Sequence, residues 1–97
     1  MIRNPNFLIT ILKTKIVVAH IDDGHVYHFP ILSDGTVSLL EGSIKPNPDA
    51  KRAPRRRLFD AHNAATAAYN RQEQAKVELA IRSALGVRKQ LSRRGQG

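Results

Sequence analysis

The fold of this chain is decided by residues 16–32, which read IVVAHIDDGHVYHFPIL. Two apolar runs flank Asp23-Gly24, and an Asp-Gly pair between such runs predicts a hairpin, because a type I′ turn needs positive φ at both central residues. A second pair, Asp34-Gly35, comes eleven residues later and leads into the apolar residues 36–40. We therefore expect a three-stranded antiparallel meander over residues 16–40.

Residues 7–12, FLITIL, form one more apolar run before the meander. This run is either a fourth strand or a direct extension of the strand that begins at Ile16, because Lys13-Thr14 is poor turn chemistry. Pro30 cannot donate a hydrogen bond to a neighbouring strand, so it belongs at a sheet edge or a bulge. Residues 1–45 thus predict a sheet region of three or four antiparallel strands.

Alternation along the expected strands sorts the side chains onto two faces of the sheet. One face is almost wholly apolar and collects Val17, Ala19, Ile21, Val26, His28, Pro30, Leu32, Val37 and Leu39. The other is apolar away from the first turn and collects Ile16, Val18, His20, Asp22, His25, Tyr27, Phe29, Ile31, Ser38 and Leu40. We expect both faces to be covered in part, one by a helix and the other by a second subunit.

Residues 46–54 are a proline-rich basic linker, since three prolines in nine residues block regular structure. Residues 55–91 are rich in alanine and predict a long helix. Its apolar stripe begins with Leu58, Ala61, Ala65, Ala68, Ala75 and Leu79, and then slides to Val77, Ala80, Ile81, Ala84, Leu85 and Leu91. The slide indicates a curved helix or a break near residues 71–74, and Gly86 is a second possible break. Residues 92–97 should form a frayed, disordered basic tail.

Together these regions predict a single α+β domain, an antiparallel meander followed by a long C-terminal helix. The chain has 97 residues, no tryptophan and five aromatic residues, so its core should be thin, which favours a homodimer. Cysteine is absent, which excludes disulfide scaffolds and Cys-based zinc sites. No apolar run is long enough to span a membrane, and Arg3 with residues 7–12 makes a poor leader peptide. We expect a cytoplasmic protein.

All of the surplus charge lies in the second half of the chain. Residues 1–45 carry four cations and four acids, whereas residues 46–97 carry twelve cations and four acids, which accounts for the whole net charge of +8. Such an asymmetry favours a polyanionic partner, most often a nucleic acid.

Two groups of cations are the candidate binding residues. The first group precedes or begins the helix and comprises Lys51, Arg52, Arg55, Arg56 and Arg57. The second forms a ridge within about 40° around a continuous helix and comprises Arg57, Arg71, Arg82, Lys89 and Arg93, with Arg88 and Arg94 nearby. One guanidinium group can donate two parallel hydrogen bonds to the oxygens of a phosphate. We therefore expect binding to the DNA or RNA backbone with little base readout. The alternative is a protein-interaction module, an adaptor or inhibitor that docks its basic helix on an acidic protein surface.

Other kinds of site have weaker support in the sequence. His20 and His25 share a face with Asp22 and could bind zinc, but such residues at hairpin ends are commonly solvated. His62 lacks a nucleophile motif, and no glycine-rich phosphate loop is present. Tyr27 and Phe29 share a face and could stack bases, although such pairs more often belong to a core. We expect a non-enzymatic protein without metal or cofactor.

Overall fold

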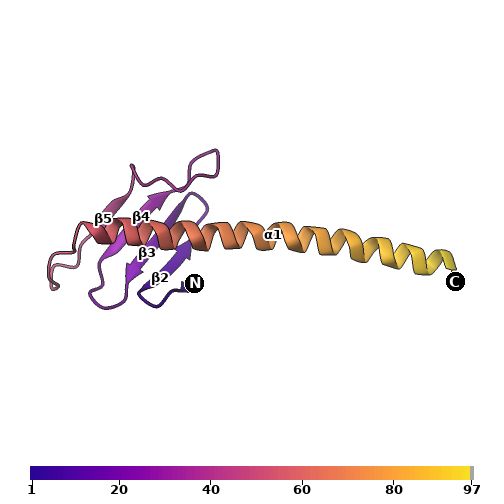
Figure 1. Ribbon diagram of the computed structural model, residues 1–97, viewed down its shortest axis with the longest axis horizontal. Helices are drawn as coiled ribbons and strands as arrows, with labels where there is room; N and C mark the ends of the chain where they lie inside the picture. Colours follow the sequence, from indigo (N-terminus) through magenta and orange to yellow (C-terminus); the bar gives the residue numbers. More distant parts are fainter. Residues whose placement is uncertain (97) are drawn as a thin grey trace.

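The computed structural model describes the backbone of residues 1–96 and the side chains of residues 1–85. Five antiparallel strands form one sheet in sequence order: β1 (Ile2–Arg3), β2 (Phe7–Ile11), β3 (Lys15–His20), β4 (Val26–Pro30) and β5 (Ser43–Lys45). One helix, α1 (Arg56–Gln96), follows them (Figure 1). The α+β prediction is confirmed. The sheet has five strands rather than three or four, because the short strands β1 and β5 extend its two edges.

The first apolar run is a separate strand. β2 pairs with β3 from Phe7↔His20 to Ile11↔Ile16. The chain reverses between them, where the Leu12 N–H donates to the Lys15 carbonyl at 2.8 Å. Of the two possibilities for residues 7–12, the structure therefore has the fourth strand and not the direct extension.

The turn at Asp23-Gly24 is not of type I′. Among the described residues only Gly24 and Gly35 have positive φ, so Asp23 does not meet the requirement of that turn. Its carboxylate instead accepts the His25 N–H at 3.0 Å, which is typical of a loop closed by an Asx turn. After the pairing Ala19↔Val26, the His20 N–H donates to the His25 carbonyl at 2.9 Å, which leaves a four-residue loop over residues 21–24, two residues away from the expected register. An even shift keeps every side chain on its face, so the predicted faces of β3 and β4 are correct.

The turn at Asp34-Gly35 differs from the expected register by one residue. Gly35 has a φ of 84° and its N–H donates to the Leu32 carbonyl at 2.9 Å, so the loop holds three residues. The resulting bridge, Ile31↔Val37, turns Val37 toward the face of Phe29, where it is buried. The prediction that Val37 lies on the opposite face is wrong, because an odd shift exchanges the faces.

Residues 36–40 do not form the expected third strand of the meander. After the single bridge at Val37, the Glu41 N–H donates to the Ser38 hydroxyl and the Gly42 N–H donates to the Leu39 carbonyl, which turns the chain. The chain then returns as β5, which pairs with β4. Leu40 is left 98% exposed at this turn.

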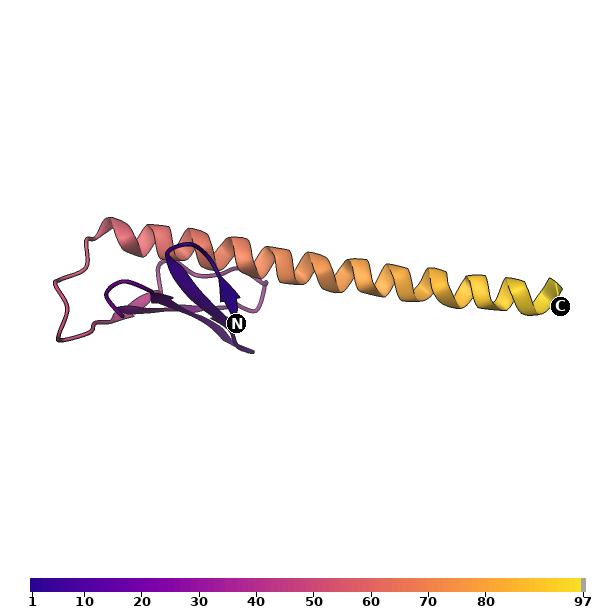
Figure 2. The ribbon, with the colours of Figure 1, turned by 90° about the horizontal axis from the view of Figure 1, so that it is seen from below.

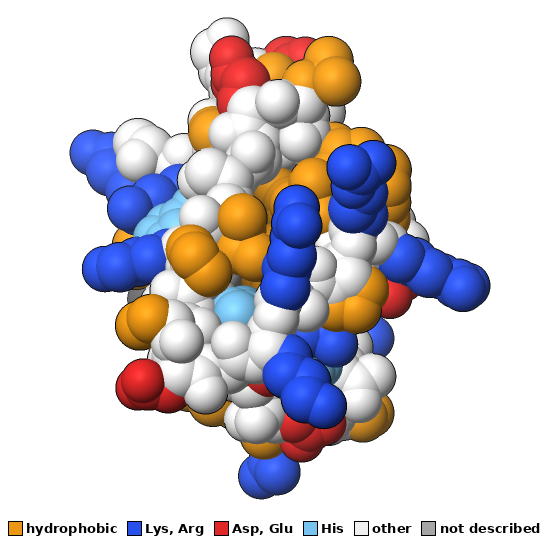
Figure 3. All heavy atoms as spheres, turned by 90° about the vertical axis from the view of Figure 1, so that its left-hand side faces the viewer, with side chains coloured by type: hydrophobic (Ala, Val, Ile, Leu, Met, Phe, Trp, Pro, Cys, Tyr) orange, Lys and Arg blue, Asp and Glu red, His pale blue; other side chains and the backbone are white. Residues whose placement is uncertain are grey.

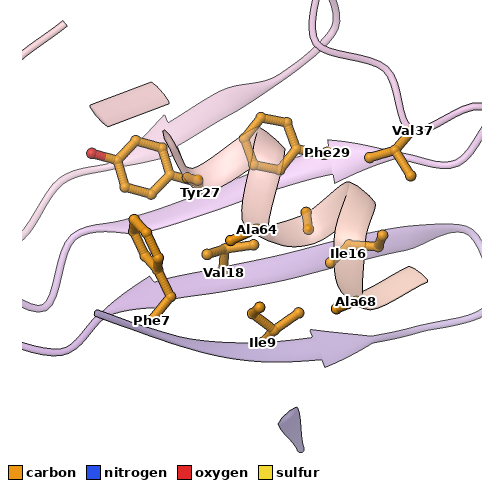
Figure 4. Packing of buried hydrophobic residues seen from close by; sticks show 11 residues of the cluster. Phe7, Ile9, Ile16, Val18, Tyr27, Phe29, Val37, Ala64 and Ala68 are labelled. Atoms are coloured by element: carbon orange, nitrogen blue, oxygen red, sulfur yellow. The ribbon is translucent and has the colours of Figure 1, made fainter. Parts of the chain in front are cut away.

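The core lies between one face of the sheet and the first turns of α1 (Figure 4). The strands and the second turn contribute Phe7, Ile9, Ile16, Val18, Tyr27, Phe29 and Val37. The buried residues of the helix are all alanines, Ala61, Ala64, Ala65 and Ala68, and the partly buried Leu58 and Tyr69 pack against the cluster. Because alanine side chains are small, α1 can lie close to the aromatic and branched residues of the sheet.

α1 extends far beyond the sheet. Its first turns lie along one face of the sheet, and the rest projects past the sheet edge (Figures 1 and 2). Every side chain from Gln74 to Leu85 is exposed. The helix passes residues 71–74 and Gly86 without a break, and its backbone continues through residues 92–96, where the sequence predicted a frayed tail. Among the described residues, no stretch of helix is both long enough and apolar enough to cross a membrane.

Candidate nucleic-acid interface

Arg57 is bound to the sheet and does not belong to the free cations. Its guanidinium pairs with the carboxylate of Asp23 in the β3–β4 turn. His20 Nδ1 also lies 3.0 Å from that carboxylate. Burial opposes ionisation of Asp23, but the His25 N–H and the charges of His20 and Arg57 outweigh it and hold the Asp23 pKa below 3.8. Arg57 therefore anchors the start of α1 to the turn.

Two histidine rings make hydrogen bonds to backbone groups of segments that are distant in the sequence. His25 is buried, its Nδ1 accepts the Asn47 N–H at 2.9 Å, and its Nε2 donates to the Lys51 carbonyl at 2.7 Å. The ring of His62 on α1 lies 2.8 Å from the Val37 carbonyl through Nε2. Both ring nitrogens of His25 thus have partners within the chain, and the linker backbone is held against the sheet at two points.

The remaining cations of the first predicted group are exposed at the start of the helix. Lys51, Arg52, Arg55 and Arg56, called the helix-start cluster below, are all exposed. Lysine and arginine side chains project from this end of the molecule in Figure 3. Among the twelve lysines and arginines of residues 1–85, only Arg57 and Lys76 lie within 4 Å of a carboxylate. The helix-start cluster is therefore available to an external anion.

The predicted ridge lies on the side of α1 that faces the sheet. Arg71 and Arg82 are exposed, and at 100° per residue they lie within about 20° of the buried Ala64. They continue the buried line of the helix beyond Ala68, on the side of α1 that its first turns present to the sheet. Arg57 shares this line but is bound to Asp23. Arg88, Lys89, Arg93 and Arg94 lie outside the residues whose side chains the structure describes.

A third group of cations, which the sequence did not predict, lies on the sheet face opposite α1. Lys15 shares this face with Val17 by alternation, and the pairings place Arg3 and Lys45 there as well. His28 lies between the lysines, and burial together with the charges of Lys15 and Lys45 lowers its pKa below 6.5. No strand position on this face carries an acid. Arg3 and Lys45 were missed because β1 and β5 are too short to show a period-2 pattern.

Tyr27 and Phe29 belong to the core and are not available to stack bases, with exposed fractions of 1% and 0%. Burial raises the pKa of the Tyr27 hydroxyl, although the nearby Arg57 charge opposes the shift. The stacking alternative is therefore wrong, because the face that carries both rings is the one that α1 covers.

A cavity of about 720 Å³ opens between the linker, β5 and the first turns of α1. Its walls are mainly apolar, and they include Tyr27, Ile44, Pro46, Ala53, Leu58 and Phe59. Arg52 and Arg55 of the helix-start cluster also line it. The cavity thus combines an apolar interior with two guanidinium groups.

Comparison with known proteins gives no relative for this chain. No protein-family model, no curated protein and no solved structure matches it. Function is therefore inferred from the charge and shape of the surfaces described above.

Proposed function

We propose that this is a small, non-enzymatic protein of the cytoplasm that binds the phosphate backbone of DNA or RNA with little base readout. The observation that supports the proposal is the set of exposed cations without carboxylate partners among residues 1–85. They gather in the helix-start cluster, along α1 at Arg71 and Arg82, and on the open sheet face at Arg3, Lys15 and Lys45. Three separated cationic surfaces suit a long, flexible polyanion better than a compact ligand.

The helix-start cluster is the surface with the densest charge. Arginine presents several N–H donors in a plane, so Arg52, Arg55 and Arg56 suit phosphate oxygens on neighbouring nucleotides. The hydrogen bond from His25 to the Lys51 carbonyl holds the adjoining backbone, which limits the entropy lost when these side chains engage a strand. Contacts of this kind position a protein on a strand without reading the sequence.

The experiment is a salt titration of binding to a labelled duplex and a labelled single strand. Each phosphate contact contributes about 0.7–0.9 to the slope of log K against log salt, so replacing Arg55 and Arg56 with Gln should lower the slope by up to about two. Arg57 stays unchanged because its loss would disturb the Asp23 turn.

The matched control is the pair Lys13→Gln and Lys76→Gln, which removes the same charge away from the helix-start cluster. We expect this control to keep most of the slope. Absence of binding to both probes at low salt would overturn the proposed function, and equal losses in the two double variants would overturn the assignment to the helix-start cluster.

The cavity beside Arg52 and Arg55 favours a second candidate function, docking on an acidic protein. An apolar side chain of the partner would enter the cavity while carboxylates meet the two guanidinium groups. This function predicts that one acidic protein remains bound in stoichiometric amount at salt concentrations that remove nucleic acid. Ala53→Trp, which fills the cavity, should release that protein without changing the salt slope for nucleic acid.

A further inference from the structure

The projecting part of α1 exposes an apolar stripe. The stripe consists of Val77, Ala80, Ile81, Ala84 and Leu85, and its three large members are 59%, 55% and 50% exposed. A lone helix in water is marginally stable even with good helix formers, and its stability in proteins comes mainly from packing of an apolar face. We therefore expect another surface to cover the stripe.

The sheet of the same chain cannot be that partner. At 100° per residue, the centre of the stripe lies about 180° around α1 from the buried Ala61, Ala64, Ala65 and Ala68. The first turns of α1 face the sheet, so the stripe points away from it. A partner can approach the outer side of the helix without meeting the sheet of the chain it binds.

We infer that the stripe binds the same stripe of a second copy of this chain, with the two helices antiparallel. An antiparallel pairing centred between Ala80 and Ile81 sets each small residue against a large one. Val77 lies opposite Ala84 of the second copy, and Ala80 lies opposite Ile81. Twofold symmetry repeats both contacts, so one apolar stripe is sufficient for both sides of the interface. The alternation of small and large residues allows the helices to interdigitate.

Charge selects the antiparallel direction. From Leu79 to the last residue the chain has five cations and no acid. On the other side of the centre, residues 71–78 are neutral, because Glu73 and Glu78 balance Arg71 and Lys76. A parallel pair would set the five cations of one copy against the same five of the other. The antiparallel pair sets the cationic end of each copy beside the glutamates of its partner, which is favourable at short range.

The open face of the sheet is the competing surface for a second copy. Leu8, Val17, Ala19 and Val26 are only half-buried there. Two such faces packed together would bring Arg3, Lys15 and Lys45 of both copies into one interface without acids, which is unfavourable. This surface is therefore the less suitable one, and the experiment includes a variant that tests it.

The first measurement is the molar mass in solution at high salt, where binding to nucleic acid is lost and an apolar interface persists. We expect the wild-type chain to be a dimer and Ile81→Glu to be a monomer. Leu79→Glu is the matched control, because Leu79 is 66% exposed on the other side of the same helix. Leu79→Glu should remain dimeric, and so should Val17→Glu in the open sheet face. A monomeric wild type, or dissociation by Val17→Glu but not by Ile81→Glu, would overturn the inference.

The second measurement tests the direction of the helices. The chain has no cysteine, so Ala67→Cys gives a single site for a spin label on an exposed position ten residues before the stripe begins. With 1.5 Å rise per residue and helices 8–10 Å apart, the antiparallel dimer places the two Cα atoms about 40 Å apart, and a parallel dimer about 10 Å. A distance near 10 Å would overturn the antiparallel arrangement. Because these measurements need no nucleic acid, their failure would leave the proposed function standing.

Discussion

Asp23 joins three parts of the molecule through one carboxylate. It closes the β3–β4 turn on the His25 N–H, it lies beside His20, and it pairs with Arg57 at the start of α1. A carboxylate with this many donors fixes where the helix begins relative to the sheet. Arg57 is thus a structural residue, although the sequence grouped it with the candidate phosphate-binding arginines.

Replacing Asp23 with Asn should lower the free energy of unfolding by about 1–3 kcal/mol at neutral pH, because Arg57 loses its charged partner. The Asp23 pKa is lowered in the folded chain, so its contribution is complete above the ordinary value of 3.8 and is lost as pH falls through the folded pKa. The difference between wild type and variant should therefore shrink below that value. Urea unfolding at neutral and acid pH measures both effects. Asp22→Asn, at an exposed neighbour, is the control and should change little.

Gly42 is required by the buried ring of Phe29. A Cβ at this position would lie 2.8 Å from two ring carbons of Phe29 and 3.0 Å from the Leu39 carbonyl oxygen. Since Phe29 is fully buried and cannot move away freely, Gly42→Ala should cost about 1–3 kcal/mol of unfolding free energy. Chemical denaturation measures the loss. The exposed Ser43→Ala is the control, and an equal effect there would contradict the role of the Phe29 contact.

At the scale of elements, the sequence predicts which strands and helices exist better than it predicts how the strands pair. The apolar runs at residues 7–12, 16–21 and 25–32 predict three strands correctly, and alanine content predicts the helix. The registers depend on loop length, which Asp-Gly alone does not fix, because side-chain contacts of Asp23 and the conformation of Gly35 select four- and three-residue loops. β1 and β5 are defined by their neighbours and have no pattern of their own.

The alanines on the inner side of α1 set the spacing between helix and sheet. Ala65 is completely buried, so Ala65→Leu forces the helix away from the strands and should lower the free energy of unfolding by about 1–3 kcal/mol. Ala67→Leu is the matched control, because it makes the same change on an exposed side of the same helix. Leucine and alanine have similar helix propensities, so this control should change stability by about 0.5 kcal/mol or less. Equilibrium unfolding in urea measures both variants.

The whole molecule divides into a folded body and a projecting helix. Its extents are 68 × 26 × 18 Å, and the long dimension comes from α1. The sequence predicted the candidate cations from charge alone. Of those whose side chains are described, all except Arg57 are exposed and have no carboxylate within 4 Å. It could not predict that Arg57 is bound or that Arg3, Lys15 and Lys45 share a face, since both depend on pairing between distant segments.

A chain that ends at Gln74 should keep its fold. The removed residues 75–85 are all exposed, so their loss costs the core no contacts. We expect the same cooperative unfolding midpoint in urea at low protein concentration, together with a lower salt slope for nucleic acid and a monomeric mass. Loss of cooperative unfolding would show that the projecting helix stabilises the sheet.

In the proposed dimer, the position of the helix-start cluster at the beginning of α1 would set a minimum length for a nucleic acid that engages both copies. About 25 residues separate Arg55 and Arg56 from the centre between Ala80 and Ile81, which is about 37 Å of helix. Twofold symmetry doubles this separation to about 75 Å, or roughly 22 base pairs of B-form duplex. With the proposed function and dimer, shorter duplexes would engage one cluster, and longer ones would engage both and gain from the high effective concentration of the second. The helix would thus act as a molecular ruler.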